Sequence, residues 1–262
     1  MKTFAQIALP IIAIILILTM LQFGPSAPKE SSGILQLPTE TEVELPIFVD
    51  TPLPPTETPT ATPVPPIFRD DFKGALAPGW VWMNEDRAAW NLTAFPGYLQ
   101  MNLSTGIVRE SNATNVLLYP IPEGDIQVTT MFTFRPIENF QFAGLIFYAS
   151  DANHFQVGRS YCRGFGEPCI KSGVYIQYYQ DYRIGTPNEA SSYNAISPII
   201  LRVTRRGNEY ALDVSSNGEV WVRFSKYTLD FQPTHVGLIA AGNQGDPALA
   251  LFDFFEISAA PK

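Results

Sequence analysis

The chain has 262 residues, of which 46% are hydrophobic and 16% are charged, and its formal net charge is −8. Residues 28–66 hold six acidic residues and one lysine, and Lys2 adds one positive charge, so residues 67–262 keep a net charge of −4. This mildly acidic balance argues against a nucleic-acid partner, which normally needs a basic face on the protein.

An apolar stretch opens the chain. Residues 3–27 contain no charged residue, and Phe4–Phe23 is almost wholly apolar over roughly 20 residues, which is enough for a helix to cross a bilayer. A secretory signal peptide is the alternative, although the prolines at 25 and 28 make a poor cleavage site. We predict that residues 1–23 form a membrane anchor or a signal peptide. In either case the domain lies outside the cell membrane, tethered to it or secreted, and a retained anchor leaves Lys2 on the cytoplasmic side.

A low-complexity segment follows at residues 24–66. Thr51–Pro66 is almost entirely proline and threonine, and three glutamates stand at alternate positions from 40 to 44. Proline favours extended polyproline II, and the like charges repel one another. This composition predicts a disordered linker that holds a domain away from a surface.

The folded domain is expected to occupy residues 67–262. Ile67–Phe72 predicts a first strand, and Tyr98–Leu103 alternates between apolar and polar residues as a half-buried strand does. Between them stand Trp80, Trp82 and Trp90. Large indoles either fill a core or, when exposed, stack on a sugar ring, and both interpretations stay open here.

Short strands separated by Gly, Pro and Asn turns continue to the C-terminus. Asn217-Gly218 predicts a type I′ hairpin turn, since both positions of that turn take positive φ. No helical periodicity is sustained after the N-terminal stretch, which indicates an all-β sandwich or barrel. The expected strands are Val116–Tyr119, Asp125–Arg135, Phe140–Ala149, His154–Arg159, Gly173–Tyr179, Pro198–Arg205, Glu209–Ser215, Val220–Phe224, Val236–Ala241 and Leu249–Ser258.

Several short motifs occur in a characteristic order. DDF, GWVW, W-x-L and PGYL come first, followed by FAGLIFYASDANHFQVGR at 142–159 and HVGLIAAGNQGDPALALFDFFEI at 235–257. In this order they resemble the concanavalin A-like domain at the C-terminus of β-xylosidases, over Phe68–Ile257. The resemblance implies a jelly-roll β-sandwich of two antiparallel sheets, with the first and last strands side by side. It also implies a non-catalytic domain, because the main catalytic acids of such β-xylosidases belong to a separate propeller domain.

Two cysteines, Cys162 and Cys169, bracket a loop rich in turn residues. Outside the cytoplasm, a close pair of this kind is most simply a disulfide. A metal site is the weaker interpretation, because the chain has only two histidines and they are distant in sequence.

Acidic residues suggest a cation site more readily than a catalytic pair. No Glu-x-Asp-x-Glu run places carboxyl groups on one strand face, so a glycoside hydrolase is only a weak alternative. The resemblance places the first and last strands together, and with them Asp70, Asp71 and Asp253. These three residues are candidate ligands of a structural Ca²⁺, or else solvated acids that protect a sheet edge.

Aromatic and planar polar side chains on the strands indicate sugar binding. Sugars present apolar C–H faces and many hydroxyl groups, so their sites combine aromatic rings with Arg, Asn, Gln or Asp. Tyr175, Gln177 and Tyr179 share one face of a strand, and the more apolar Val174 and Ile176 favour the core for the opposite face. This face is either a binding surface or a tyrosine-rich solvent face without a ligand. The candidate ligand-binding residues are Trp82, Arg87, Trp90, Arg109, Tyr148, Arg159, Tyr175, Gln177 and Tyr179.

Together these features predict a membrane-tethered, extracellular, non-catalytic, lectin-like domain that binds a glycan or polysaccharide. The alternative is a cell-surface structural or protein-interaction module without sugar affinity. The pattern predicts no particular oligomeric state.

Overall fold

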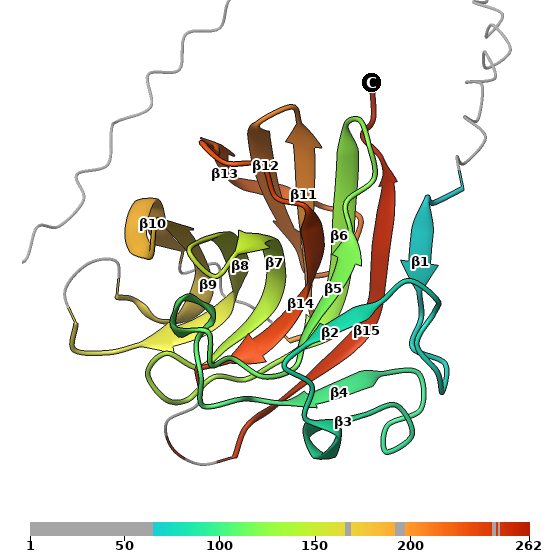
Figure 1. The fold of residues 1–262 in the computed structure, drawn as a ribbon, viewed down its shortest axis with the longest axis vertical. Helices are drawn as coiled ribbons and strands as arrows, with labels where there is room; N and C mark the ends of the chain where they lie inside the picture. The colour runs from blue at the N-terminus through green and yellow to red at the C-terminus, as the bar shows by residue number, and fades with distance from the viewer. Residues whose placement is uncertain (1–64, 166–168, 192–196, 243–244, 246) are drawn as a thin grey trace, which may run out of the picture. The chain divides into compact units, whose positions relative to one another are not determined.

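The computed structural model describes residues 65–165, 169–191, 197–242, 245 and 247–262 (Figure 1). These residues belong to the second of two units in the chain, Thr60–Lys262. The predicted anchor and nearly all of the predicted linker lie outside the described residues. Within the described part, no helix is long and apolar enough to span a bilayer.

Fifteen strands of the described chain form two sheets in which every pairing is antiparallel (Figure 1). The eight-stranded sheet has the order β13-β12-β11-β6-β15-β4-β3, with β1 also paired to β15. Its strands are β1 Phe68–Asp70, β3 Trp90–Asn91, β4 Leu99–Asn102, β6 Ile126–Thr133, β11 Ile199–Arg206, β12 Glu209–Ser215, β13 Val222–Thr228 and β15 Leu249–Ala259.

The seven-stranded sheet has the order β10-β9-β8-β7-β14-β5-β2. Its strands are β2 Val81–Met83, β5 Val116–Pro120, β7 Phe142–Ser150, β8 Asn153–Cys162, β9 Lys171–Gln180, β10 Arg183–Ser191 and β14 His235–Ala241. Two short 3₁₀ turns, η1 Arg87–Ala89 and η2 Val108–Glu110, are the only helical segments in the described residues. The structure therefore confirms an all-β sandwich of two antiparallel sheets, which fits a jelly roll.

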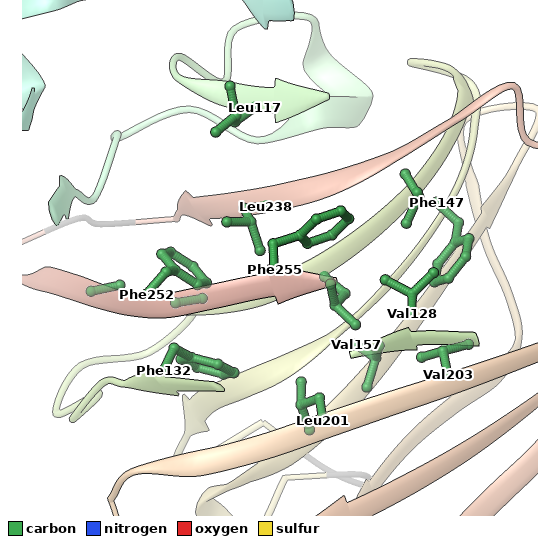
Figure 2. Close-up of a cluster of buried hydrophobic side chains, with 14 of the residues drawn as sticks. Leu117, Val128, Phe132, Phe147, Val157, Leu201, Val203, Leu238, Phe252 and Phe255 are labelled. Atoms are coloured by element: carbon green, nitrogen blue, oxygen red, sulfur yellow. The ribbon is translucent and has the colours of Figure 1, made fainter. Parts of the chain in front are cut away.

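The hydrophobic core lies between the two sheets (Figure 2). In β6 the even-numbered residues from 126 to 132 are buried and their neighbours are half-buried, as period-two alternation requires. Phe132 and Phe252 from the larger sheet pack at a centroid distance of 5.3 Å. Phe147 and Leu238 enter the same core from the smaller sheet. Every residue of the buried clusters lies between Phe68 and Ile257, so the second unit contains its own core.

The first and last strands lie side by side, as the resemblance implied. Phe68 pairs with Ile257, and its ring stacks on Tyr119 at 3.9 Å. At the end of β1 the buried Asp70 carboxylate accepts the backbone N–H groups of Phe72 and Ala77 and the indole N–H of Trp80, each at 2.8 Å. The three hydrogen bonds of this one carboxylate thus fix the conformation of the loop between β1 and β2.

The Asn217-Gly218 hairpin differs from the expected type I′ turn. β12 ends at Ser215 and β13 begins at Val222, so the loop is longer than a two-residue turn. Gly218 has a φ of 78°, whereas Asn217 is absent from the residues with positive φ. Instead, the Asn217 side chain accepts the N–H groups of Glu219 and Val220. The dipeptide predicted a turn correctly and its type wrongly.

Three strands were not predicted from the sequence. β2 and β3 have only three and two residues, which is too short to show a period. β10 has the sequence RIGTPNEAS, without apolar alternation, and a proline is tolerated there because β10 is an edge strand.

Candidate functional site

The outer face of the seven-stranded sheet is partly covered by the connection between β4 and β5. Val108 and Ala113 of this connection pack on Phe142 and Ile146 of β7 and on Ile239 of β14. This second apolar cluster explains why the first part of β7 is buried on both faces. Among the described residues, β8 and β9 contribute none to this second cluster.

Asp151, in the turn between β7 and β8, fastens that connection to the sheet. Its carboxylate accepts the Ser111 hydroxyl at 2.5 Å and the Tyr148 hydroxyl at 2.9 Å. Farther along, the Asn84 amide donates to the Ala113 carbonyl at 3.0 Å. Near its start, the Ser104 N–H of the connection donates to the Ala240 carbonyl at 3.2 Å, so the covering segment is held at both ends and forms a fixed wall.

A pocket of about 430 Å³ lies between this wall and β8 and β9. Its floor is built from residues that alternate with core residues along both strands. Gln156 stands directly opposite Gln177, and His154 stands opposite Tyr179. Tyr175 continues the same face on β9, and all five side chains line the pocket.

Two cross-strand glycines leave the sheet bare beside Tyr175. Gly158 of β8 pairs with Tyr175 on one side and with Gly144 of β7 on the other. A Cβ atom at Gly158 would lie 2.2 Å from the Ala143 carbonyl oxygen, so the neighbouring strand approaches too closely for a side chain. Glycine therefore satisfies the packing of the sheet, and this part of the face carries no side chain.

His154 is fully buried in the floor of the pocket, and its ring stacks on Tyr179 at 4.6 Å. Among the described residues, neither ring nitrogen has a partner in hydrogen-bonding geometry. Burial lowers the pKa of His154 to about 4, although the nearby backbone of Asp151 and Ser150 and the Asp151 carboxylate act in the opposite direction. The imidazole is therefore neutral at physiological pH and can both donate and accept a hydrogen bond.

We expect the buried His154 to make stability depend on pH. Its pKa is about 4 in the folded protein and 6.5 ordinarily, so the unfolded chain binds more protons between these values. The free energy of unfolding should therefore fall as the pH is lowered through this window, by about 3 kcal/mol in total. Urea unfolding of the wild type and His154→Gln at a series of pH values measures the difference in slope. Parallel curves for the two proteins would contradict this assignment.

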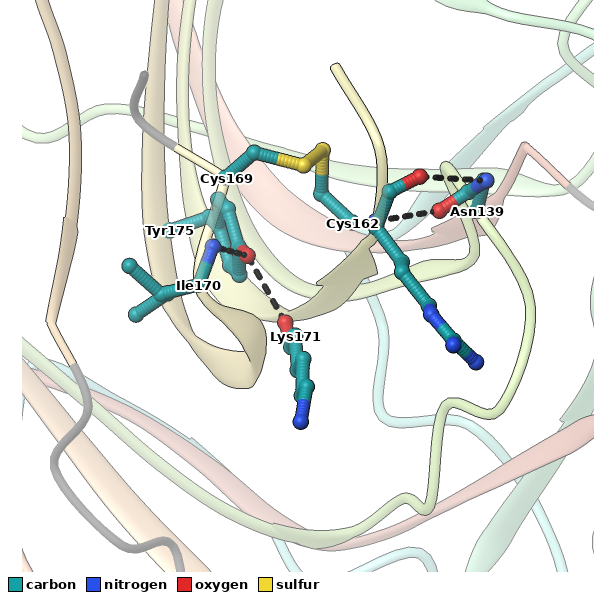
Figure 3. The surroundings of a disulfide bond; sticks show 7 residues. Asn139, Cys162, Cys169, Ile170, Lys171 and Tyr175 are labelled. Atoms are coloured by element: carbon teal, nitrogen blue, oxygen red, sulfur yellow. Dashed lines mark hydrogen bonds between the residues drawn. A yellow bond between two sulfur atoms is a disulfide. The ribbon is translucent and has the colours of Figure 1, made fainter. Parts of the chain in front are cut away.

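The disulfide closes one end of the pocket, and its geometry confirms the predicted pairing (Figure 3). The Tyr175 hydroxyl accepts the Ile170 N–H at 3.0 Å and donates to the Lys171 carbonyl at 2.7 Å. On the Cys162 side, the Asn139 side-chain amide accepts the Arg163 N–H at 2.6 Å and donates to the Arg163 carbonyl at 3.2 Å. Hydrogen bonds therefore fix the chain on both sides of the disulfide, next to Cys162 and next to Cys169.

Arg109 from η2 supplies the one guanidinium among the described residues that line the pocket. Its Cζ atom lies 5.8 Å from the centre of the Tyr179 ring, and a terminal nitrogen lies 3.7 Å from the Glu110 carboxylate. Glu110 is also the one carboxylate in the described lining, so this lining offers no facing pair of acids for glycoside hydrolysis.

The structure brings together four of the predicted ligand-binding residues. Arg109, Tyr175, Gln177 and Tyr179 all line the pocket. Sequence reasoning left His154 and Gln156 out of the candidate site. The two residues are spaced by two on β8 with the fully buried Phe155 between them. This spacing could have placed both side chains on the face opposite the core.

Arg159 and Tyr148 were predicted to belong to this site and do not line it. Arg159 pairs with Val174, a core residue, and its guanidinium donates to the Ser172 hydroxyl at 3.1 Å. It therefore occupies the face of β8 that is turned toward the other sheet, where burial lowers its pKa. Tyr148 packs against the second apolar cluster and donates its hydroxyl proton to Asp151.

Trp82, Trp90 and Arg87 form a separate group away from the pocket. The two indoles pack at a centroid distance of 4.8 Å, and both contact the main core. The Arg87 guanidinium lies 3.9 Å from the centre of the Trp90 ring. These tryptophans fill the edge of the sandwich, which corrects their assignment to the ligand site.

The three carboxylates proposed as calcium ligands do not form one ligand set. Asp70 is occupied by three N–H donors, and Asp71 forms ion pairs with Arg69 at 2.7 Å and Lys73 at 3.3 Å. Burial and the neighbouring Asp71 raise the pKa of Asp253. Within the described residues, no three His, Cys, Asp or Glu side chains converge as a metal site would require.

Known proteins share this architecture. Residues 69–258 match the family described as the β-xylosidase C-terminal concanavalin A-like domain. The solved GH43 protein BlXynB from Bacillus licheniformis has a TM-score of 0.64 and 20% identity, over 73% of this chain and 39% of that one. A xylan β-1,4-xylosidase from Bacillus halodurans C-125 has a TM-score of 0.60 and 18% identity, over 80% and 41%.

A third structure, the GH43B protein of the Bacteroides ovatus xyloglucan PUL, has a TM-score of 0.64 and 19% identity, over 76% of this chain and 40% of its own. The chain thus spans about two fifths of the length of these structures. No curated protein matches it. Since the family match covers most of the sequence, the chain belongs to the family of β-xylosidase C-terminal concanavalin A-like domains.

Proposed function

We propose that the domain binds carbohydrate without catalysing a reaction, and that its site is the pocket on β8 and β9. The observation that carries this proposal is a buried imidazole without a partner in the floor. Neither ring nitrogen of His154 has a hydrogen-bond partner within the described residues, and the amides of Gln156 and the half-buried Gln177 lie beside it in the same floor. Buried polar groups normally have partners, so a bound molecule rich in hydroxyl groups would complete them.

The shape and charge of the pocket suit a neutral sugar. Tyr175 and Tyr179 provide aromatic rings beside the amide pair, and sugars combine apolar C–H faces with hydroxyl groups. His154 is neutral, and Arg109 lies next to the oppositely charged Glu110. A volume of about 430 Å³ is near the lower end for ligand pockets, which fits a short saccharide or the end of a longer chain.

The names of the similar solved structures suggest the first ligands to test. One similar structure is a xylan β-1,4-xylosidase, and another belongs to a xyloglucan locus. Xylose-containing saccharides are therefore the starting panel for this domain. The predicted anchor and linker would present the domain outside the cell, where the disulfide is stable.

A protein-interaction module is the second candidate. Phe140 and Phe165 are exposed at the mouth of the pocket, and exposed aromatic side chains are frequent in protein interfaces. This candidate does not explain the polar groups in the floor, so we favour carbohydrate.

Titration calorimetry with xylose and xylo-oligosaccharides tests the proposal on residues 60–262. Gln177→Ala is expected to weaken binding about tenfold or more, because its amide faces the ligand. The matched control is Gln127→Ala, which changes an amide on β6 in the other sheet. No binding across a broad glycan panel, by protein shown to be folded, would instead favour the interaction module.

A further inference from the structure

The pocket has chemically different ends. The register of β8 and β9 places the His154–Tyr179 pair at one end, the Gln156–Gln177 pair in the middle, and Cys162 at the other end. The disulfide end is apolar, because Phe140, Phe142 and Phe165 line it together with the two sulfur atoms. The floor therefore changes from amide and imidazole groups to aromatic rings along one strand pair.

Phe140 and Phe165 are held in place although they are exposed. Phe140 is 40% exposed and Phe165 is 55% exposed, and their ring centres lie 5.1 Å apart. Phe140 has a φ of 71°, an uncommon conformation for a bulky residue, and its N–H donates to the Tyr161 carbonyl at 2.9 Å. The paired hydrogen bonds between Asn139 and Arg163 join the two segments that carry these rings.

The fixed rings suit an apolar group better than a second sugar ring. A second sugar would bring hydroxyl groups that need partners, and unpaired buried polar groups are unfavourable. Two polar side chains at this end already have partners, since the Tyr175 hydroxyl and the Asn139 amide both bond to backbone. The rings themselves are tilted by 57° and offer no single flat platform.

The two ends of the pocket are separated along β8. Ser160, which pairs with Phe142, stands four residues along this strand from Gln156. At about 3.3 Å per residue, the two backbone positions lie about 13 Å apart, so a ligand that contacts side chains from both ends has to be longer than a single sugar ring.

We propose that the pocket selects sugars that carry an aromatic substituent, with the sugar on the Gln156–Gln177 pair and the substituent between Phe140 and Phe165. This specificity rests on the carbohydrate-binding function proposed above and goes beyond it. The amides and His154 fix the hydroxylated part, and the phenylalanines with the disulfide contact the apolar part. Aromatic rings pack favourably on other rings and on sulfur.

The test compares two probes, methyl β-D-xyloside and phenyl β-D-xyloside, by titration calorimetry on residues 60–262, which contain their own core. Wild-type protein should bind the phenyl compound about tenfold more tightly, because one additional ring leaves water. Phe165→Ala should weaken binding of the phenyl compound much more than binding of the methyl compound, and so remove this preference. Gln177→Ala should weaken binding of both compounds by the same factor.

Phe95→Ala is the matched control, since Phe95 is 46% exposed and does not line the pocket. It should leave both affinities unchanged. Equal binding of the two xylosides by the wild type would overturn the proposed specificity while leaving carbohydrate binding intact. A phenyl preference that survives Phe140→Ala/Phe165→Ala would overturn it as well. If neither compound binds and a wider glycan panel also fails, the proposed function is wrong and the specificity falls with it.

Discussion

Replacing Asp70 by alanine is expected to lower the free energy of unfolding by about 4 kcal/mol, because a buried carboxylate that serves three donors is lost. The N–H groups of Phe72 and Ala77 and the indole of Trp80 would lose their acceptor. The loop between β1 and β2 has no other group in this position. Urea unfolding followed by tryptophan fluorescence measures the loss directly.

Asp71→Ala is the matched control for this change. Asp71 is next in sequence, but its carboxylate is more than one third exposed, and it forms ion pairs with the exposed side chains of Arg69 and Lys73. Exposed ion pairs contribute little, so the expected loss is below about 1 kcal/mol. Similar losses for the two variants would show that Asp70 does not organise the loop.

Replacing Phe255 by alanine should destabilise the domain by about 4 kcal/mol, the usual range for a large aromatic residue in a core. Its side chain is fully buried and lies 4.8 Å from the Trp80 ring and 6.2 Å from the Phe68 ring, measured between centroids. The cavity would open where β1 and the following loop meet β15. Thermal and urea unfolding both report this loss.

The neighbouring Phe254 gives the comparison. It points to the outer face of the sheet, where the Arg69 guanidinium lies 4.4 Å from its ring centre. Phe254→Ala removes only this contact and part of its half-buried surface, so a loss of about 1 kcal/mol is expected. If Phe254→Ala were as damaging as Phe255→Ala, the assignment of inner and outer faces in β15 would be wrong.

Most of the strands could be predicted because one face of each is buried and the other is not. The eight residues of β6 alternate without exception, and the expected segment contained them all. β10 could not be predicted in this way, because an edge strand can satisfy its backbone with few apolar side chains. The type of the Asn217-Gly218 turn depended on a side-chain hydrogen bond that the dipeptide alone does not specify.

The candidate site was only partly predictable, because both faces of β8 are buried. The pattern of its residues therefore does not distinguish the face toward the core from the face toward the pocket. Every residue from His154 to Ser160 is buried, on the core side by the other sheet and on the pocket side by walls from distant segments. Arg159 was therefore assigned to the wrong face. The pocket itself depends on where the β4–β5 connection ends and the disulfide loop begins, which is a non-local property of the fold.

The pairing of β1 with β15 also decides how the domain bears a mechanical load. The N-terminal part of the chain enters through β1, so a pull on it acts first on a strand of only three residues. Within that strand, the Asp70 carboxylate binds the loop that follows, and the Phe68 ring stacks on Tyr119 of the seven-stranded sheet. Tension between the N-terminal segment and a ligand held on β8 and β9 would thus pass through the core, and the backbone pairing of β1 with β15 together with the Arg69–Glu256 ion pair would resist the separation of the two strands.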